Sequence, residues 1–140
     1  MKILRAFIAA LAITVFGTVL VGLTCGWLFN WVYQLEPTNV WKPMKGPPGT
    51  DFLAGGFVLN LVFVGVYLFL RAGIPGSSLY VKGLFFGLCV WAVGVLPGMF
   101  SMYYFMTINP TVVVYWAIMG LIHALLNGLI VAAICARQTC

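Results

Sequence analysis

Residues 110–136 read PTVVVYWAIMGLIHALLNGLIVAAICA and decide the fold class of this chain. The stretch contains no Asp, Glu, Lys or Arg, and the polar groups in its middle are those of His123 and Asn127. A helix needs about 20 predominantly apolar residues to cross the hydrocarbon core of a bilayer. The run exceeds that length, so the sequence predicts a membrane-spanning helix here.

The rest of the chain has the same character. Of its 140 residues, 64% are hydrophobic and 6% are charged, whereas soluble domains carry about a quarter charged residues. Its acids are Glu36 and Asp51. So few charges cannot cover a surface that faces water, and the solvent is expected to be a lipid bilayer. We therefore predict an all-α integral membrane protein.

Four apolar stretches qualify as spans, and they occupy most of the chain. The expected helices cover about residues 4–33, 52–70, 79–106 and 110–136. Together they predict a four-transmembrane-helix antiparallel bundle that forms a single transmembrane domain over residues 1–140. The first run is longer than the apolar part of a secretory signal, and it is interpreted as an uncleaved helix.

Prolines are expected to shape one loop and one helix. The loop over residues 34–51 contains Pro37, Pro43, Pro47 and Pro48 and cannot form a regular helix. It is either a stiff connector or a cap over the bundle, with Trp41 and Met44 dipping into the headgroup layer. Pro97 is expected to kink the third helix.

The basic residues predict the orientation. With the N-terminus inside, five of them fall on the cytoplasmic side: Lys2, Arg5, Arg71, Lys82 and Arg137. Lys42 and Lys45 remain outside, in the loop that also holds the two acids. This bias predicts that both termini are cytoplasmic. The general character of the chain is that of small bacterial inner-membrane proteins, so a bacterial cytoplasmic (inner) membrane is expected. Because the basic residues are scattered along the chain, no nucleic-acid partner is expected.

Small residues at a spacing of four indicate where helices approach each other closely, because lipid gives no hydrophobic drive to helix pairing. The candidate packing residues are Gly22 and Gly26 in the first helix, Gly83, Gly87, Gly94 and Gly98 in the third, and Gly120, Ala124, Gly128 and Ala132 in the fourth. These stripes pack inside the chain, or one of them serves a second copy or another subunit.

Three polar residues are predicted near mid-membrane: Asn60 in the second helix, and His123 and Asn127 on one face of the fourth. Intramembrane polar groups are costly and are often functional. Their structural interpretation is a hydrogen-bonded cluster in which neutral His123 pairs with Asn60. Their functional interpretation makes His123 a proton carrier or ligand, although no carboxylate accompanies it.

The chain lacks the residue sets of familiar catalytic and cofactor sites. Its single histidine has no Cys, Asp or Glu at metal-ligand spacing, and its four cysteines form no CxxC pair. No catalytic residues, no metal and no cofactor are predicted, and the chain is not expected to be an enzyme.

Three functions remain open from the sequence. The leading one is an assembly or interaction role, as a homo-oligomer or an accessory subunit of a larger membrane complex. The alternative is a small transporter or channel with a polar path near Asn60, His123 and Asn127. A third is a subunit that borrows a cofactor from a partner, with His123 as an axial ligand.

Overall fold

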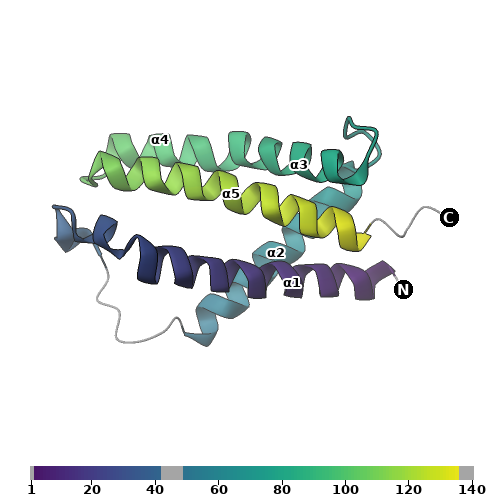
Figure 1. Ribbon diagram of the computed structural model, residues 1–140, viewed down its shortest axis with the longest axis horizontal. Coiled ribbons are helices and arrows are strands. Elements are labelled where there is room, and N and C mark those ends of the chain that lie inside the picture. Colours follow the sequence, from purple (N-terminus) through teal and green to yellow (C-terminus); the bar gives the residue numbers. More distant parts are fainter. Residues whose placement is uncertain (1, 42–48, 136–140) are drawn as a thin grey trace.

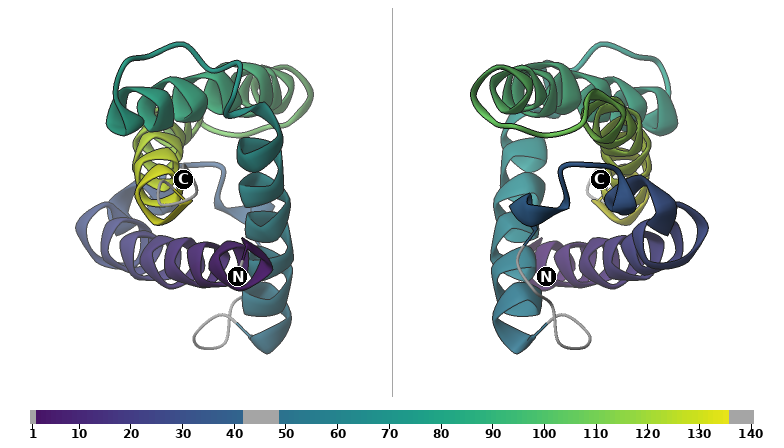
Figure 2. Two further views of the ribbon diagram at one scale, coloured as in Figure 1. Left: turned by 90° about the vertical axis from the view of Figure 1, so that its right-hand side faces the viewer. Right: turned by 90° about the vertical axis from the view of Figure 1, so that its left-hand side faces the viewer.

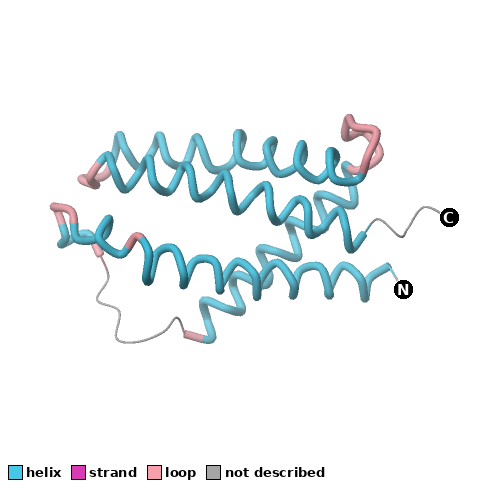
Figure 3. The backbone as a smooth tube through the Cα atoms, in the orientation of Figure 1, coloured by secondary structure: helices cyan, strands magenta, loops and turns pink. Residues whose placement is uncertain are grey.

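The computed structural model describes residues 2–41 and 49–135, and over these residues the chain is helical without strands (Figure 3). The α-helices are α1 (Lys2–Leu23), α2 (Thr50–Leu70), α3 (Leu79–Val90), α4 (Leu96–Phe105) and α5 (Pro110–Cys135). Two π-helical turns, η1 (Thr24–Leu28) and η4 (Trp91–Val95), extend α1 and join α3 to α4. Two 3₁₀ turns, η2 (Asn30–Gln34) and η3 (Thr38–Val40), follow α1.

Four helical segments are long and apolar enough to cross a membrane. They are Ile3–Leu28, Thr50–Leu70, Leu79–Phe105 and Pro110–Cys135, with mean hydropathies from 1.9 to 2.4. Each satisfies the length of about 20 residues that a span requires. The prediction of an all-α chain with four candidate membrane spans is thereby confirmed.

The first helix differs from the expected range of residues 4–33, because it ends before Tyr33. The Thr24 hydroxyl donates to the Leu20 carbonyl at 2.7 Å, and the Phe29 amide then bonds the Thr24 carbonyl at 2.8 Å in a π turn. Phe29 leaves the helical conformation, with φ −117° and ψ 24°. The chain continues as a 3₁₀ turn that buries Val32. Apolar composition alone could not distinguish this turn from a further helical turn.

The helices surround the molecular axis as four sides of a frame (Figure 2). The segment α3–η4–α4 lies alongside α5, and α1 lies on the other side of α5 (Figure 1). Helix α2 crosses obliquely from α1 to α3 (Figure 1). Ring contacts join α2 to both neighbours: Phe57 meets Phe7 of α1 at 6.1 Å, and Phe63 meets Phe86 of α3 at 5.0 Å. Both termini lie at the same end of the molecule.

The tightest helix pair is α3 with α5, and glycine makes it tight. A Cβ placed on Gly83 would lie 2.6 Å from the Gly128 carbonyl oxygen and 2.8 Å from the Ala132 Cβ. A Cβ on Gly87 would lie 2.7 Å from the Ala124 carbonyl carbon. These distances leave no space for a larger residue. The two backbones therefore meet through small residues, the arrangement by which helices pack in lipid.

Buried side chains gather in two clusters. The larger, at the end that carries the termini, takes residues from all four spans: Ala9, Ala10, Ile13, Val64, Tyr67, Phe86, Val131, Ala132 and Cys135. The smaller, at the opposite end, consists of Val32, Ile108, Val112 and Val113. Most other large apolar side chains face outward, as expected where lipid is the solvent.

The irregular part of the third span begins before Pro97. The π turn Trp91–Val95 ends two residues before the proline, whose missing N–H deprives the carbonyl four residues earlier of its helical partner. The Trp91 indole N–H donates to the Ala117 carbonyl at 2.8 Å and ties this turn to α5. The irregularity thus falls where the sequence predicted a kink.

Helix α5 begins at Pro110, the position that the sequence favours because proline fits the first helical turn. Asn109 caps it, because its side-chain oxygen accepts the Thr111 amide at 3.0 Å. The Asn109 side-chain amide donates to the Glu36 carbonyl at 3.1 Å. One side chain therefore starts α5 and holds the residues that follow α1 against it.

Candidate functional site

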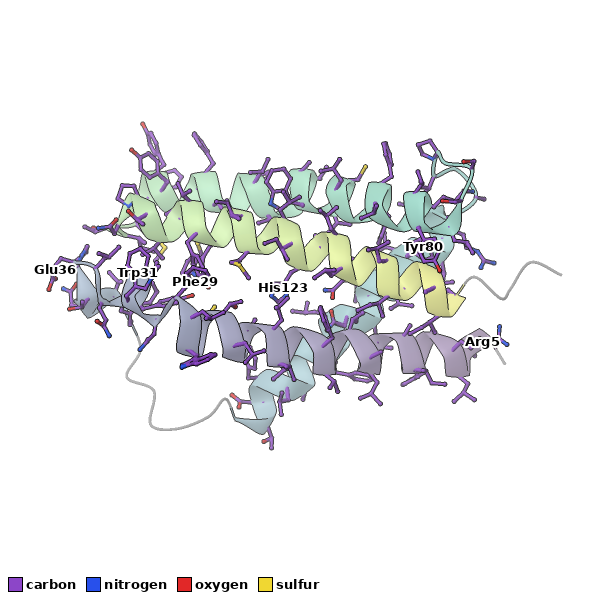
Figure 4. The ribbon with its side chains drawn as sticks, viewed as in Figure 1. Arg5, Phe29, Trp31, Glu36, Tyr80 and His123 are labelled. Carbon is purple, nitrogen blue, oxygen red and sulfur yellow. The ribbon has the colours of Figure 1, made fainter. Side chains whose placement is uncertain are left out.

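Helix α5 presents two different faces. Its small-residue face, with Ala124 and Gly128, packs on α3. The side chain of His123 points from α5 toward α1 (Figure 4), and Asn127 follows one helical turn later on the same face. The small residues on one side fix the rotation of α5, and that rotation directs both polar side chains into the space facing α1 and α2.

Asn60 of α2 finds its partner on α1. Its side-chain amide donates to the Thr14 hydroxyl oxygen at 2.9 Å, and the Thr14 hydroxyl donates to the Ala10 carbonyl at 2.7 Å. Within the described part of the chain, no hydrogen bond joins Asn60 to His123. The expected hydrogen bond between His123 and Asn60 is therefore wrong. Asn60 bonds Thr14 instead, because the oblique course of α2 brings Asn60 to α1.

A polar cavity of about 160 Å³ lies between α1, α2 and α5. Thr14, Thr18, Asn60, His123 and Asn127 contribute its polar lining. The three residues that the sequence singled out therefore line one cavity. Gly17 of α1 also lines it, and a Cβ on Gly17 would lie 4.0 Å from His123 Nδ1, an ordinary van der Waals contact.

One atom of this cavity is unsatisfied. The side-chain oxygen of Asn127 is buried and has no hydrogen-bond donor within the described residues. Buried polar groups are nearly always paired, and one that is not commonly marks a functional site or a place for water. The cavity thus presents a hydrogen-bond acceptor that the chain itself leaves unused.

Sequence reasoning missed the contribution of α1. Thr14 and Thr18 are four residues apart, so they share a face, and both hydroxyls bond back to their own helix, to Ala10 and Thr14 respectively. Their spacing, with Gly17 between them, was a signal in the sequence. The signal is weak, because threonine is common in membrane helices, where it satisfies its own hydrogen bond.

Only some of the predicted small-residue stripes pack against another helix. Gly83, Gly87, Ala124, Gly128 and Ala132 come together between α3 and α5. Gly120 faces Val95, whose side-chain carbon would lie 2.8 Å from an added Cβ. For Gly22, Gly26, Gly94 and Gly98, an added Cβ would meet nothing within 4 Å. These four predicted packing residues therefore have no helix against them within the described chain.

Aromatic side chains close the end opposite the termini. The Trp116 indole donates to the Tyr33 hydroxyl at 2.8 Å, and the Trp41 ring lies edge-on to both residues at 5.3 and 5.7 Å. Burial raises the pKa of Tyr33 well above its ordinary value. The loop residue Trp41 therefore packs onto the helices, as the capping interpretation expects, whereas Met44 lies outside the described residues. The rings fill this region, and we interpret them as a cluster that stabilises the fold.

The site contains no charged pair and no ligand set. Over residues 2–41 and 49–135, no three His, Cys, Asp or Glu side chains gather where they could hold a metal ion. The arrangement can offer amide, hydroxyl and imidazole hydrogen bonds to a small polar group.

The observations define a class: a chain that is helical over its described residues, with four candidate membrane spans and a cavity with polar lining residues between three of them. Comparison with protein families, with curated proteins and with solved structures finds no match to this chain.

Proposed function

We propose that this chain is a non-enzymatic assembly protein of a bacterial inner membrane, which binds a second copy of itself or a larger membrane complex through two open glycine stripes. They are Gly22 and Gly26 of the segment α1–η1, and Gly94 and Gly98 of the segment η4–α4. The observation that carries the proposal is the contrast between stripes. The glycines of α3 have backbone against them, whereas nothing approaches Gly22 and Gly26 on one side of the molecule or Gly94 and Gly98 on another.

Lipid is a poor partner for such a stripe. A row of glycines leaves a shallow groove along a helix, and another helix fills that groove with van der Waals contacts that lipid tails match less well. Gly22 and Gly26 are exposed and are bordered by exposed Leu23 and Trp27. A partner helix seated on Gly22 would therefore contact backbone in the groove and large side chains at its rim.

The test compares two glycine-to-leucine variants by light scattering in mild detergent. Gly22→Leu fills the open stripe, and Gly65→Leu is the matched control, because Gly65 also has nothing within 4 Å but belongs to neither stripe. A homo-oligomer gives a protein mass that is a multiple of 15.3 kDa. Gly22→Leu is expected to reduce it to one chain, and Gly65→Leu is expected to leave it unchanged.

An accessory subunit gives a different result in the same comparison. The wild-type chain then captures the same membrane proteins in repeated purifications, Gly22→Leu loses them, and Gly65→Leu keeps them. A wild-type particle of one chain without partners, extracted in several mild detergents, would contradict the assembly role in both forms.

The proposal places both termini in the cytoplasm. Arg5 lies at the end of the molecule that carries the termini (Figure 4). Lys82 at the start of α3 donates to the Arg71 carbonyl after α2 at 3.4 Å, so helix ends with basic residues meet there. Such residues favour the cytoplasmic side. A fluorescent protein fused after Cys140 should fold and fluoresce, and alkaline phosphatase at the same position should be inactive; the reverse pattern would refute this orientation.

A second candidate function is a small transporter or channel, which the polar cavity favours. Its path would pass Asn60, His123 and Asn127, the residues that line the cavity. Flux of small solutes into proteoliposomes, reduced by both His123→Ala and Asn60→Ala, would support it. Equal flux in the wild type and both variants would exclude this path.

A further inference from the structure

Helices α1 and α2 enclose a second hollow beside the polar cavity. It is an apolar groove of about 500 Å³ whose lining includes Leu11, Val15, Val19, Ala54 and Phe57. Thr14, Thr18 and Leu53 line both the groove and the cavity. The two hollows are therefore neighbours, with a long apolar region on one side of these three residues and a small polar region on the other.

The hydrogen bonds determine what the polar region can accept. The hydroxyls of Thr14 and Thr18 both donate to backbone carbonyls of α1, at 2.7 and 2.8 Å. The side-chain amide of Asn60 donates to the Thr14 hydroxyl oxygen. Unused acceptors remain in the Thr18 oxygen and in the buried Asn127 side-chain oxygen, which has no donor among the described residues. Asn127 and His123, which line the cavity, also carry N–H donors. A hydroxyl, which both donates and accepts a hydrogen bond, is therefore a complementary head group.

The charges decide between kinds of head group. Among the residues that line the two hollows there is no Asp, Glu, Lys or Arg. Placing an ion among apolar side chains without a counter-charge is strongly unfavourable. A carboxylate or phosphate head is therefore a poor fit, and an uncharged head is a good one.

The volume of the polar cavity allows a group larger than one structural water. A water occupies about 30 Å³, so the polar cavity of about 160 Å³ has the volume of several waters. A cavity of roughly 150 Å³ can hold a benzene-sized molecule. The polar region is thus large enough for a small head group bearing one or two hydroxyls.

We propose that these hollows form one binding site for an uncharged single-chain membrane amphiphile, such as a monoacylglycerol or an isoprenoid alcohol. The apolar chain lies in the groove between α1 and α2. The head passes Leu53 and donates a hydrogen bond to Asn127. This site does not depend on self-association, because both hollows are formed within one chain.

The direct test is photolabelling in phosphatidylcholine nanodiscs with monoolein that carries a diazirine on its chain. Mass spectrometry should find the label on α1 and α2 peptides. Unlabelled monoolein should compete for the site, whereas octadecene, which has the chain without the head, and oleate, which has a charged head, should compete poorly. Equal competition by octadecene or oleate would overturn the assignment of an uncharged donor head.

Variants test the two regions separately. Asn127→Leu removes the acceptor and should weaken monoolein binding about five- to tenfold. Leu53→Trp should block the passage between the hollows and abolish labelling, whereas Leu59→Trp on the lipid-facing side of the same helix, where Leu59 is 71% exposed, should not. Equal labelling of the wild type, Asn127→Leu and Leu53→Trp would overturn the proposal.

A gentler pair protects this test against misfolding. Thr18→Val keeps the shape of the side chain but removes its oxygen, and Thr18→Ser keeps the oxygen. Weakened binding in Thr18→Val with recovery in Thr18→Ser supports the site, and equal binding in both contradicts it. Lipids extracted from the purified chain then distinguish a monoacylglycerol from an isoprenoid alcohol. Extracts that contain only phospholipid, in equal amounts from the wild type and Thr18→Val, would count against both.

Discussion

Gly87→Ala should loosen the α3–α5 pair. The added Cβ would lie closest to the Ala124 carbonyl oxygen, 2.7 Å from the Ala124 carbonyl carbon and 2.9 Å from the Leu125 Cα, well inside the 3.4 Å at which ordinary contact begins. All of the nearest atoms are backbone, so no side chain can rotate away and the helices must separate. Overpacking of this kind costs about 1–3 kcal/mol. Because alanine also gains about 1 kcal/mol of helix propensity, we expect a net loss of up to about 2 kcal/mol.

The assay is unfolding by an increasing mole fraction of SDS in mixed micelles, followed by tryptophan fluorescence. Gly65→Ala is the matched control, because its Cβ meets nothing within 4 Å and Gly65 belongs to neither open glycine stripe. The midpoint should fall for Gly87→Ala and should hold or rise for Gly65→Ala. Equal midpoints for the two variants would refute the close backbone contact between α3 and α5.

Three further perturbations test other contacts. A double-mutant cycle with Thr14→Val and Asn60→Leu should give a coupling free energy of about 0.6–1.7 kcal/mol in the same unfolding assay, because the two side chains share a 2.9 Å hydrogen bond. Zero coupling would refute this contact between α1 and α2. Burial raises the pKa of Tyr33 above the ordinary 10.0, so the folded state holds the phenol proton more tightly. Stability from this residue should be complete below pH 10 and decline as pH rises above it; Tyr33→Phe should reduce the alkaline decline in melting temperature, and an unchanged decline would refute burial of the phenol. Asn109→Ala removes the cap of α5 and should lower the unfolding free energy by about 0.5–2 kcal/mol. An unaltered SDS midpoint would show that the cap does not stabilise the chain.

The four candidate spans could be predicted because length and hydropathy are properties of the sequence alone. The third and fourth segments end within a residue or two of the expected positions, at Phe105 and Cys135. The first does not, because the break at Phe29 arises where the chain turns to bury Val32. That turn has Trp31, Val32 and Tyr33 between its polar ends Asn30 and Gln34, so apolar composition did not distinguish it from a further helical turn.

The course of α2 could not be predicted. A membrane helix that is apolar on every side gives no pattern from which to infer the face that packs, and α2 contains apolar residues all round. Its tilt determines whether Asn60 meets α5 or α1. The sequence therefore identified Asn60 as an intramembrane hydrogen-bonding residue but assigned it to His123 rather than Thr14.

The α3–α5 stripe shows the opposite case. Spacing of four on two neighbouring helices leads to the observed meeting of Gly83 and Gly87 with Gly128, because close approach requires small residues on both sides. The same spacing in Gly22 and Gly26 leads to no contact within the described chain. Spacing thus indicates a surface suited to packing, and only the arrangement of the helices determines whether the chain uses it.

The claim on which all else depends is that hydrocarbon surrounds the outward faces of these helices. It can be measured with spin labels on Leu59→Cys, Val93→Cys and Ile118→Cys, one at a time in liposomes and in a background without the native cysteines. These side chains are 71%, 79% and 55% exposed on three different spans. Each label should collide readily with oxygen, which dissolves in lipid, and rarely with a water-soluble nickel chelate. Frequent collision with the nickel chelate at all three positions would show that water bathes these faces, and that result would contradict the membrane assignment.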